Sequence, residues 1–100
     1  MNRIPPQLRE DMSADPYYGA CARQGKDCQG RITWEHCFTY KGRQIQEKWA
    51  IIPLCVHHHL GVGLAKAINR GIAVRRATPE ERKKYPLIDY GFYERISTRA

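Results

Sequence analysis

No stretch of this sequence is apolar for long enough to cross a membrane, and no segment has a strongly biased composition. A spanning helix needs about 20 apolar residues in succession, so the sequence excludes that class of protein. The first residues, MNRIPPQLRED, also lack the apolar core of a secretory signal. We therefore expect the protein in the cytoplasm, with no membrane partner, where cysteines stay reduced.

Acidic residues are few. The chain has 10 Asp and Glu against 17 Lys and Arg, which gives a formal net charge of +7. An excess of this size favours a polyanionic partner such as DNA, because bound phosphates release their counterions. The same excess also serves solubility in proteins that bind no nucleic acid, so charge alone leaves both interpretations open.

The chain is also short. One hundred residues make one small domain, 1–100, in which folding buries only a modest fraction of the surface. A structural metal or a partner chain would help such a domain to fold. A homodimer, or a complex with another protein, is compatible with this size.

Local patterns predict short strands and short helices, that is, an α+β fold. Strands are expected at 31–35 and 48–54, separated by a polar loop at 37–46. Helices are expected, in chain order, at 7–12, at 57–69 with a stop at Gly71, from the cap Thr78 onward, and at 87–96. Four residues are predicted to be hydrophobic core rather than base-stacking platforms: Trp34, Trp49, Ile51 and Leu54.

Four cysteines contribute to the first candidate site. In a reducing compartment they favour a metal site over two disulfides. His58 follows Cys55 by three residues at the start of a predicted helix, so the two side chains face each other. Cys21 and Cys28 flank a tight loop, which must fold back for both sulfurs to reach one ion. These residues predict a closed, structural Cys3His zinc site. The alternative is a set of ordinary buried thiols, which is what we expect for Cys37.

Three consecutive histidines follow shortly after Cys55. His59 lies about 100° around a helix from His58, so it can serve a second site while His58 binds zinc. His57 lies on another side and is expected to face solvent or an acidic group. The sequence leaves the assignment open, since His57 or His59 could instead be the zinc ligand.

An acid–histidine pair, Glu35 and His36, ends the first predicted strand. Hydrolysis of a phosphodiester needs a base to deprotonate water and a cation to neutralise the developing charge. Histidine suits the base, and a carboxylate with a histidine suits a hard divalent ion such as Mg²⁺ or Mn²⁺. By itself, such a pair is more often a surface feature than a catalytic site.

Three segments together resemble the HNH nuclease motif (ββα-metal, or His-Me finger) of strand, loop, strand and helix: W-E-H at 34–36, K-W-A-I-I-P-L-C at 48–55 and C-V-H-H-H at 55–59. The resemblance covers about residues 21–65. With the C-x6-C pair, the chain is similar to small HNH proteins of bacteriophages and prophages. It implies a ββα-metal core with a zinc knuckle and flanking helices, and a bacterial host cell as the location.

The resemblance implies a role for each residue of the candidate sites. Glu35 and His59 would bind the catalytic Mg²⁺ or Mn²⁺, and His36 would be the general base. The structural Zn²⁺ would be held by Cys21, Cys28, Cys55 and His58. The implied function is a metal-dependent endonuclease that hydrolyses phosphodiester bonds in DNA.

Three positions depart from the family pattern. Glu35 stands where Asp is usual, and His58 replaces a cysteine, which zinc accepts. The usual Asn, whose side chain orients the loop that bears the base, falls near Ala50. An alanine cannot form that hydrogen bond. Three residues of the intervening loop are candidates to replace it: Arg43, Gln44 and Gln46.

Basic residues near the motif are the candidate DNA contacts. Lys41 and Arg43 lie in the loop beside the predicted site. Arg75 and Arg76 belong to a C-terminal basic set that also contains Arg70, Arg82, Lys83 and Lys84.

Two other functions remain open. A non-catalytic, zinc-containing nucleic-acid-binding module of phage origin would keep the scaffold without the reaction. A small phage protein could instead use its basic face to bind an acidic partner protein.

Overall fold

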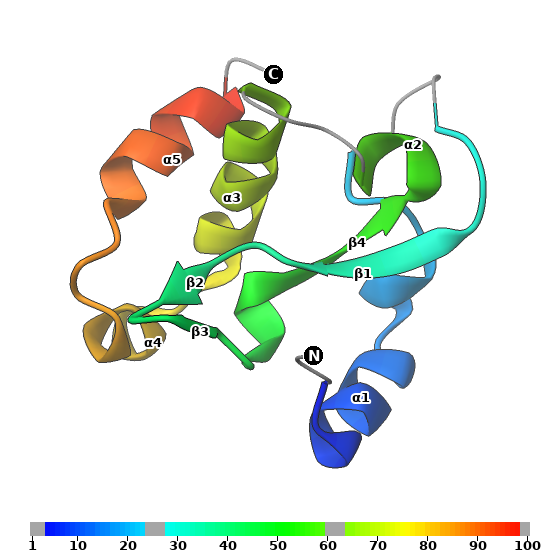
Figure 1. Cartoon of the computed structure of the whole chain (residues 1–100), viewed down its shortest axis with the longest axis horizontal. Helices are drawn as coiled ribbons and strands as arrows, with labels where there is room; N and C mark the ends of the chain where they lie inside the picture. The colour runs from blue at the N-terminus through cyan, green and yellow to red at the C-terminus, as the bar shows by residue number, and fades with distance from the viewer. Residues whose placement is uncertain (1–3, 24–27, 60–63, 99–100) are drawn as a thin grey trace.

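An antiparallel pair of strands, β1 (Ile32–His36) and β4 (Ile51–Cys55), lies at the centre of the fold (Figure 1). The structure, a computed structural model, describes residues 4–23, 28–59 and 64–98. A second, smaller antiparallel sheet pairs β2 (Thr39–Tyr40) with β3 (Arg43–Gln44). The architecture is therefore a small α+β domain with two short sheets and several helices, as the sequence predicted at that level of detail.

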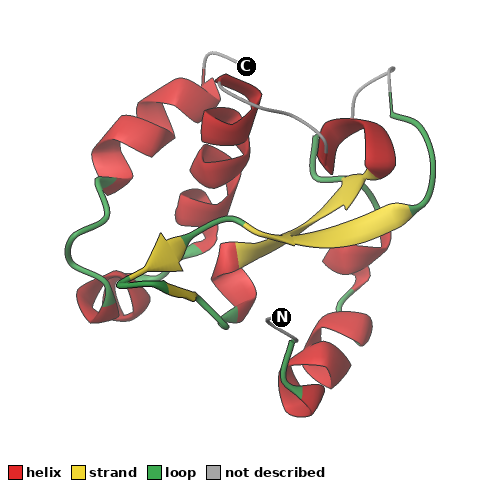
Figure 2. Cartoon of the chain, viewed as in Figure 1, coloured by secondary structure: helices red, strands yellow, loops and turns green. Residues whose placement is uncertain are grey.

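Helices surround the central strand pair (Figure 2). The α-helices are α1 (Pro6–Ser13), α2 (Val56–His59), α3 (Leu64–Arg76), α4 (Pro79–Lys84) and α5 (Tyr90–Thr98), and the short 3₁₀ helices are η1 (Pro16–Gly19) and η2 (Lys48–Ala50). In Figure 1, α3 and α5 lie side by side, and α2 continues directly from the end of β4. α1 lies below the β1–β4 pair. Among the helices of the described ranges, none is both long and apolar enough to cross a membrane.

β4 is apolar throughout because both of its faces are covered. All five of its residues are buried. Ile52 and Leu54 belong to the larger core cluster, which also contains residues from the end of α3. Ile51 packs on the other side, with Met12 of α1 and Tyr18 of η1. A strand buried on both faces is expected to be continuously hydrophobic rather than alternating.

The register of the strand pair places the candidate residues. Thr33 lies opposite Leu54, Glu35 opposite Ile52, and His36 opposite Ile51. Because successive side chains of a strand point to opposite faces, Thr33 and Glu35 share one face.

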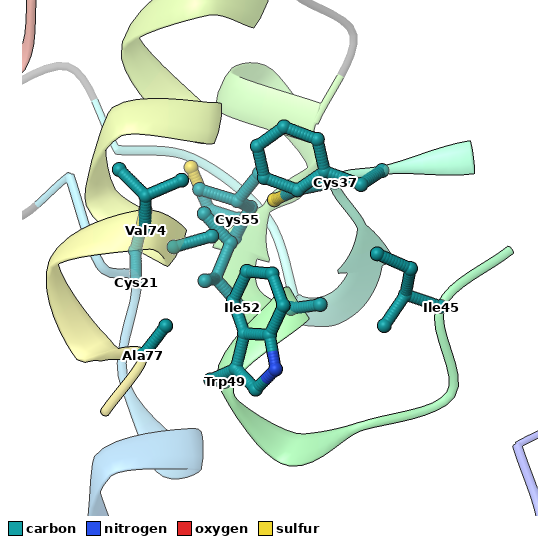
Figure 3. Packing of buried hydrophobic residues seen from close by; sticks show 12 residues of the cluster. Cys21, Cys37, Ile45, Trp49, Ile52, Cys55, Val74 and Ala77 are labelled. Atoms are coloured by element: carbon teal, nitrogen blue, oxygen red, sulfur yellow. The ribbon is translucent and has the colours of Figure 1, made fainter. Parts of the chain in front are cut away.

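The larger core cluster fills the space between β4 and α3. Figure 3 shows Trp49 and Ile52 at its centre, with Val74 and Ala77 approaching from the end of α3. Three residues predicted as core, Trp49, Ile51 and Leu54, are at most 2% exposed. The fourth, Trp34, is half-buried and packs against the smaller cluster. The predicted core is therefore confirmed, with Trp34 at its edge.

The start of α4 follows capping chemistry, whereas the predicted end of α3 does not hold. Thr78 accepts a hydrogen bond from the backbone N–H of Glu81, whose side chain accepts one from the Thr78 N–H, so α4 begins where predicted with a complete capping box. The predicted stop at Gly71 is wrong. Gly71 is buried inside α3, which continues to Arg76, because tertiary packing outweighs the modest helix propensity cost of one glycine.

Two other predictions about local structure need correction. The segment 37–46 is not a plain loop, because β2 and β3 form a small hairpin there. Its two-residue turn has Lys41 at φ 51° and Gly42 at φ 85°, the pair of positive values that matches the twist of the flanking strands. The second central strand begins at Ile51 rather than at Lys48, since 48–50 form η2. The predicted helix 57–69 is described as α2 and α3, with residues 60–63 outside the described ranges.

Candidate functional site

Four side chains converge where β4 enters α2. The ligand atoms of Cys21, Cys28, Cys55 and His58 all lie within 4.8 Å of one another. Nδ1 of His58 is 3.3 Å from Sγ of Cys21, 3.5 Å from Sγ of Cys28 and 3.2 Å from Sγ of Cys55. Tetrahedral zinc, with bonds of about 2.3 Å to sulfur and about 2.0 Å to nitrogen, places such atoms about 3.5 Å apart. The residues therefore fit a closed four-coordinate site and could hold a metal ion such as zinc.

Local backbone geometry brings the two halves of this site together. Gly30 has a φ of +83°, and a Cβ at this position would lie 3.1 Å from Cβ of Val56. Only glycine combines that conformation with so close an approach. The N–H of Val56 donates to the carbonyl of Arg31, and the N–H of Gln29 points at Sγ of Cys55. The segment 28–31, which carries Cys28 and forms the described end of the predicted zinc knuckle, is thus held against the start of α2 by its main chain.

Charge at the cluster suits a cation. Burial alone would raise the pKa of the Cys55 thiol, but backbone N–H groups of His58 and Gln29 lower it, and the pKa falls to about 6. The pKa of Cys21 is lowered in the same way, against its burial. Burial acts to lower the pKa of His58, yet the adjacent sulfurs raise it. The site therefore stabilises thiolates, which are the form that binds metal.

A second pair of side chains consists of Glu35 from β1 and His59 from α2. Nδ1 of His59 is 3.8 Å from Oε1 of Glu35 and 2.9 Å from the hydroxyl of Thr33. That hydroxyl also lies 2.9 Å from the carbonyl of Leu54, which can only accept. Since a hydroxyl has one proton, Thr33 donates to Leu54 and accepts from Nδ1–H of His59. The proton of His59 is thereby assigned to Nδ1, and Nε2 carries the lone pair that a metal needs.

Glu35 is held from the other side by a buried amide. Asn69 of α3 is 1% exposed; its side chain hydrogen-bonds to Glu35 and accepts from Nη1 of Arg23 at 3.1 Å. Burial raises the pKa of Glu35 even though His59 and the nearby Lys66 act to lower it. A half-buried carboxylate of this kind is stabilised when a cation approaches.

His36 occupies the neighbouring position of β1. Its Nε2–H donates to Oε1 of Gln46 at 2.8 Å, so Nδ1 carries the lone pair that can accept a proton. Strand alternation directs His36 and Glu35 to different faces of β1 at its last two residues. The structure therefore brings Glu35 and His59 together, whereas His36 lies at the end of β1 and contacts Gln46.

His36, at the end of β1, and the residue after it are held by side-chain and main-chain contacts. The carbonyl of Ala50 accepts a hydrogen bond from the N–H of Cys37 at 2.9 Å. Of the three predicted substitutes for the usual Asn, Gln46 is the one whose side chain contacts His36. Cys37 itself is buried, and burial raises the pKa of its thiol, as predicted for a small core residue.

The four predicted DNA contacts lie in different environments. Lys41 and Arg43 are exposed on the β2–β3 hairpin. Arg75 is exposed and donates to the carbonyl of Glu94. Arg76 differs: its guanidinium lies 4.0 Å from the ring centre of Tyr17 and donates to the hydroxyl of Tyr18. Arg76 is therefore engaged in internal packing, whereas the other three present their charge to solvent.

Sequence reasoning missed three residues of this site. Thr33, Asn69 and Arg23 carry no local signal, because a threonine in a strand and an asparagine in a helix are ordinary. Arg23 and Asn69 are 46 residues apart in the chain. Only the folded arrangement shows that they act on His59 and Glu35.

Comparison with known proteins adds no family to this description. No protein-family model matches the chain, and neither a curated protein nor a solved structure matches it. The function of this chain is therefore inferred from its residues and their geometry.

Proposed function

We propose that this protein is a metal-dependent DNA endonuclease of the ββα-metal type, built on a structural zinc site. The observation that carries the proposal is that two adjacent histidines face two different sets of ligand atoms. His58 points to three sulfurs, while His59 points to a carboxylate and a hydroxyl. One donor set is soft and closed, and the other is hard and incomplete, which is what a structural and a catalytic metal respectively require.

Zn²⁺ is assigned to the Cys3His cluster. Three thiolates and one imidazole leave no coordination position for substrate, so this metal stabilises the fold and performs no chemistry. In a chain of 100 residues, it links the knuckle that carries Cys21 and Cys28 to the end of β4.

Mg²⁺ or Mn²⁺ is assigned to Glu35 and His59. When bound, such an ion supplies a positive charge that stabilises the phosphate and the departing oxygen. Glu35 contributes a negative ligand from a buried position, and Thr33 holds Nε2 of His59 in ligand form. His36, held by Gln46, takes a proton from the attacking water at Nδ1. Lys41 and Arg43 bind phosphates beside the site and orient the strand.

The second candidate is a non-catalytic, zinc-containing module that binds nucleic acid. Two observations favour it. Ala50 offers a backbone carbonyl but no side-chain amide, and His36 leaves the strand on the face opposite to Glu35. This alternative shares the zinc site and the basic surface with the nuclease and lacks only the reaction.

The deciding experiment is nicking of supercoiled plasmid by the purified chain, with Mg²⁺ or Mn²⁺ and with neither. His36→Ala and His59→Ala are compared with His57→Ala, a matched control because His57 is an exposed neighbour in the same triplet. Zinc content and thermal unfolding are measured for each variant. We expect nicking by the wild type and by His57→Ala, and a loss of at least about 100-fold in the other two.

Each result has a distinct meaning. Equal nicking by His36→Ala and the wild type would reject His36 as the base. If the zinc-loaded wild type and variants all bind DNA and none of them nicks it, the binding module would replace the nuclease as the function. Purified protein with almost no zinc would remove the structural assignment, whatever the activity.

A further inference from the structure

One hollow in the described part of the molecule has a lining that includes none of the proposed catalytic residues. It is a pocket of about 480 Å³ between the β2–β3 hairpin, α3 and the segment leading into α5. Ligand pockets in proteins commonly fall in the range of about 300–1,000 Å³. Its lining residues are Phe38, Thr39, Tyr40, Lys41, Arg70, Leu87, Ile88, Asp89, Phe92 and Tyr93.

The walls of this pocket are aromatic. Phe38 and Tyr93 meet edge to face with ring centres 5.4 Å apart, and Phe92 meets Tyr93 at 5.2 Å. Phe92 is 43% exposed and Leu87 is 77% exposed. These are two of the three exposed large hydrophobic side chains among the described residues. Exposed apolar surface gathered at one hollow indicates a binding role.

The charge on the pocket is positive. Lys41 and Arg70 both line it, and the guanidinium of Arg70 lies 5.9 Å from the ring centres of both Phe38 and Tyr93. The one carboxylate, Asp89, accepts a hydrogen bond from the N–H of Phe92 and is engaged at the start of α5. Lys41 also adopts a positive φ that side chains other than glycine and asparagine rarely take, at the tip of the hairpin beside the pocket.

Two residues that line the pocket follow shortly after residues of the candidate site in the chain. Arg70 follows Asn69, the buried amide that contacts Glu35, and its Nε donates to the carbonyl of Cys37 at 3.1 Å. Phe38 lies two residues beyond His36 on the same chain segment. Two residues that line the pocket, Phe38 and Arg70, are therefore close in the chain to the residues around Glu35.

We propose that the pocket binds an unpaired nucleobase, so that the protein acts on single-stranded or locally opened DNA. Aromatic faces stack on any base, while flanking cations hold the adjacent phosphates. A base inside a duplex has both faces covered by its neighbours and cannot enter without leaving the stack. This inference rests on the proposed function in taking DNA as the polymer that is bound, and it adds the structural class of substrate.

The test is fluorescence titration of a 12-mer oligodeoxythymidine that contains one 2-aminopurine, single-stranded and in duplex, without added divalent metal. Phe92→Ala is compared with Phe92→Leu, which keeps an apolar side chain but has no aromatic face. Lys41→Ala is compared with Lys83→Ala, an exposed lysine of α4 that does not line the pocket. Circular dichroism checks that each variant is folded.

We expect the wild type to bind the single strand more tightly than the duplex and to quench the 2-aminopurine. Phe92→Ala and Phe92→Leu should each weaken single-strand binding by about tenfold, the range found for one lost stacking contact, with little effect on the duplex. Lys41→Ala should weaken it more than Lys83→Ala.

Unchanged affinity in both Phe92 variants would overturn the pocket, as would equal binding of single strand and duplex. Plasmid nicking is scored separately. Nicking that depends on His36 together with unchanged Phe92 variants would reject the pocket and keep the nuclease. Stacking without nicking would keep the pocket and reject the nuclease.

Discussion

Single side chains determine which atoms of this site are available for chemistry. The hydroxyl of Thr33 donates a hydrogen bond to the carbonyl of Leu54 and accepts one from Nδ1–H of His59. It therefore determines which nitrogen of His59 can bind a metal. Such supporting contacts are often worth as much to a metal site as a direct ligand. No coordinating group is lost if Thr33 is changed, which makes it a clean test of the arrangement.

Thr33→Val is expected to weaken Mn²⁺ binding by about 10-fold or more, because Nδ1 of His59 loses its acceptor and the ring can turn. Thr33→Ser keeps the hydroxyl and is expected to bind Mn²⁺ nearly as the wild type does. Electron paramagnetic resonance titration measures the free ion directly, without any requirement for cleavage. Equal Mn²⁺ affinity in the valine and serine variants would show that His59 is not held through Thr33.

Glu35 illustrates the cost in stability of a buried charge. Burial raises its pKa in the folded chain, so folding favours the protonated carboxyl. The stability that this group contributes is present at acid pH and is lost as the pH rises through its raised pKa. At neutral pH without a divalent ion, the carboxylate is therefore expected to destabilise the protein, as metal-binding acids often do.

Glu35→Gln is thus expected to raise the melting temperature at pH 7 by about 2–5 °C in the absence of divalent ions, and by less at pH 4. Added Mn²⁺ should stabilise the wild type and leave the glutamine variant unchanged. Thermal unfolding followed by circular dichroism measures both effects. Glu10→Gln, an exposed acid on α1, is the matched control and should melt with the wild type. A lower melting temperature for Glu35→Gln would contradict this account of Glu35.

Among the elements, the knuckle and the start of α2 hold each other in place. Gly30 allows the chain to pass within van der Waals contact of Val56, and Arg23 reaches from the knuckle to Asn69 on α3. The knuckle therefore supports the zinc ligands and, through Asn69, the orientation of Glu35. The Cys3His cluster and the Glu35–His59 pair share this support although they have no residue in common.

Gly30→Ala is expected to destabilise the protein by about 1–3 kcal/mol, since alanine is strained at a φ of +83° and would press against Val56. Gly19→Ala is the matched control, because a Cβ there meets nothing within 4 Å and its φ is not positive. Urea unfolding of the zinc-loaded chains provides the two free energies of unfolding. Equal values would mean that the knuckle relaxes around the extra methyl group.

On the scale of the whole molecule, the fold is compact but small. Its radius of gyration is 13.0 Å, the value expected for a folded chain of this length. Two hydrophobic clusters lie on either side of β4, and neither is extensive. A domain of this size commonly needs a staple, and the Cys3His cluster is placed to provide one.

Acid is expected to release that staple in a defined range. Because hydrogen bonds from backbone N–H groups lower the pKa of Cys55 to about 6 against the opposing effect of burial, its thiolate stabilises the folded chain at alkaline pH. That contribution declines as the pH falls and is lost on passing through about pH 6. Unfolding should therefore become easier as the pH falls from about 9 to about 6, with release of zinc.

A zinc-sensitive dye, read together with circular dichroism during acid titration, measures both events. A strong chelator at pH 7.5 should produce the same loss of structure, and Cys55→Ser should fold poorly at any pH. Cys37→Ser alters a cysteine outside the cluster, so zinc content should be unchanged. A chain that keeps its melting temperature after complete chelation would show that the metal is not structural.

The local features of this protein could be predicted from residues that lie close together in the chain. Hydrophobic patterns located β1, β4 and most of the helices, and the Thr78 cap located the start of α4, because these features depend on residues a few positions apart. The facing of Cys55 and His58, and the different direction of His59, also followed from helix geometry. Residue-by-residue roles came from a family resemblance, and the general-base role of His36 stays a prediction.

Contacts between residues that are distant in the chain became visible only in the folded structure. It brought Cys21 and Cys28 to the start of α2 and joined Glu35 to Asn69, since contacts between distant segments depend on the packing of the whole core. It also extended α3 through Gly71, where burial outweighed local preference. Thr33 and the pocket beside Arg70 had no signal in the sequence, because an ordinary residue acquires a role only from its neighbours in space.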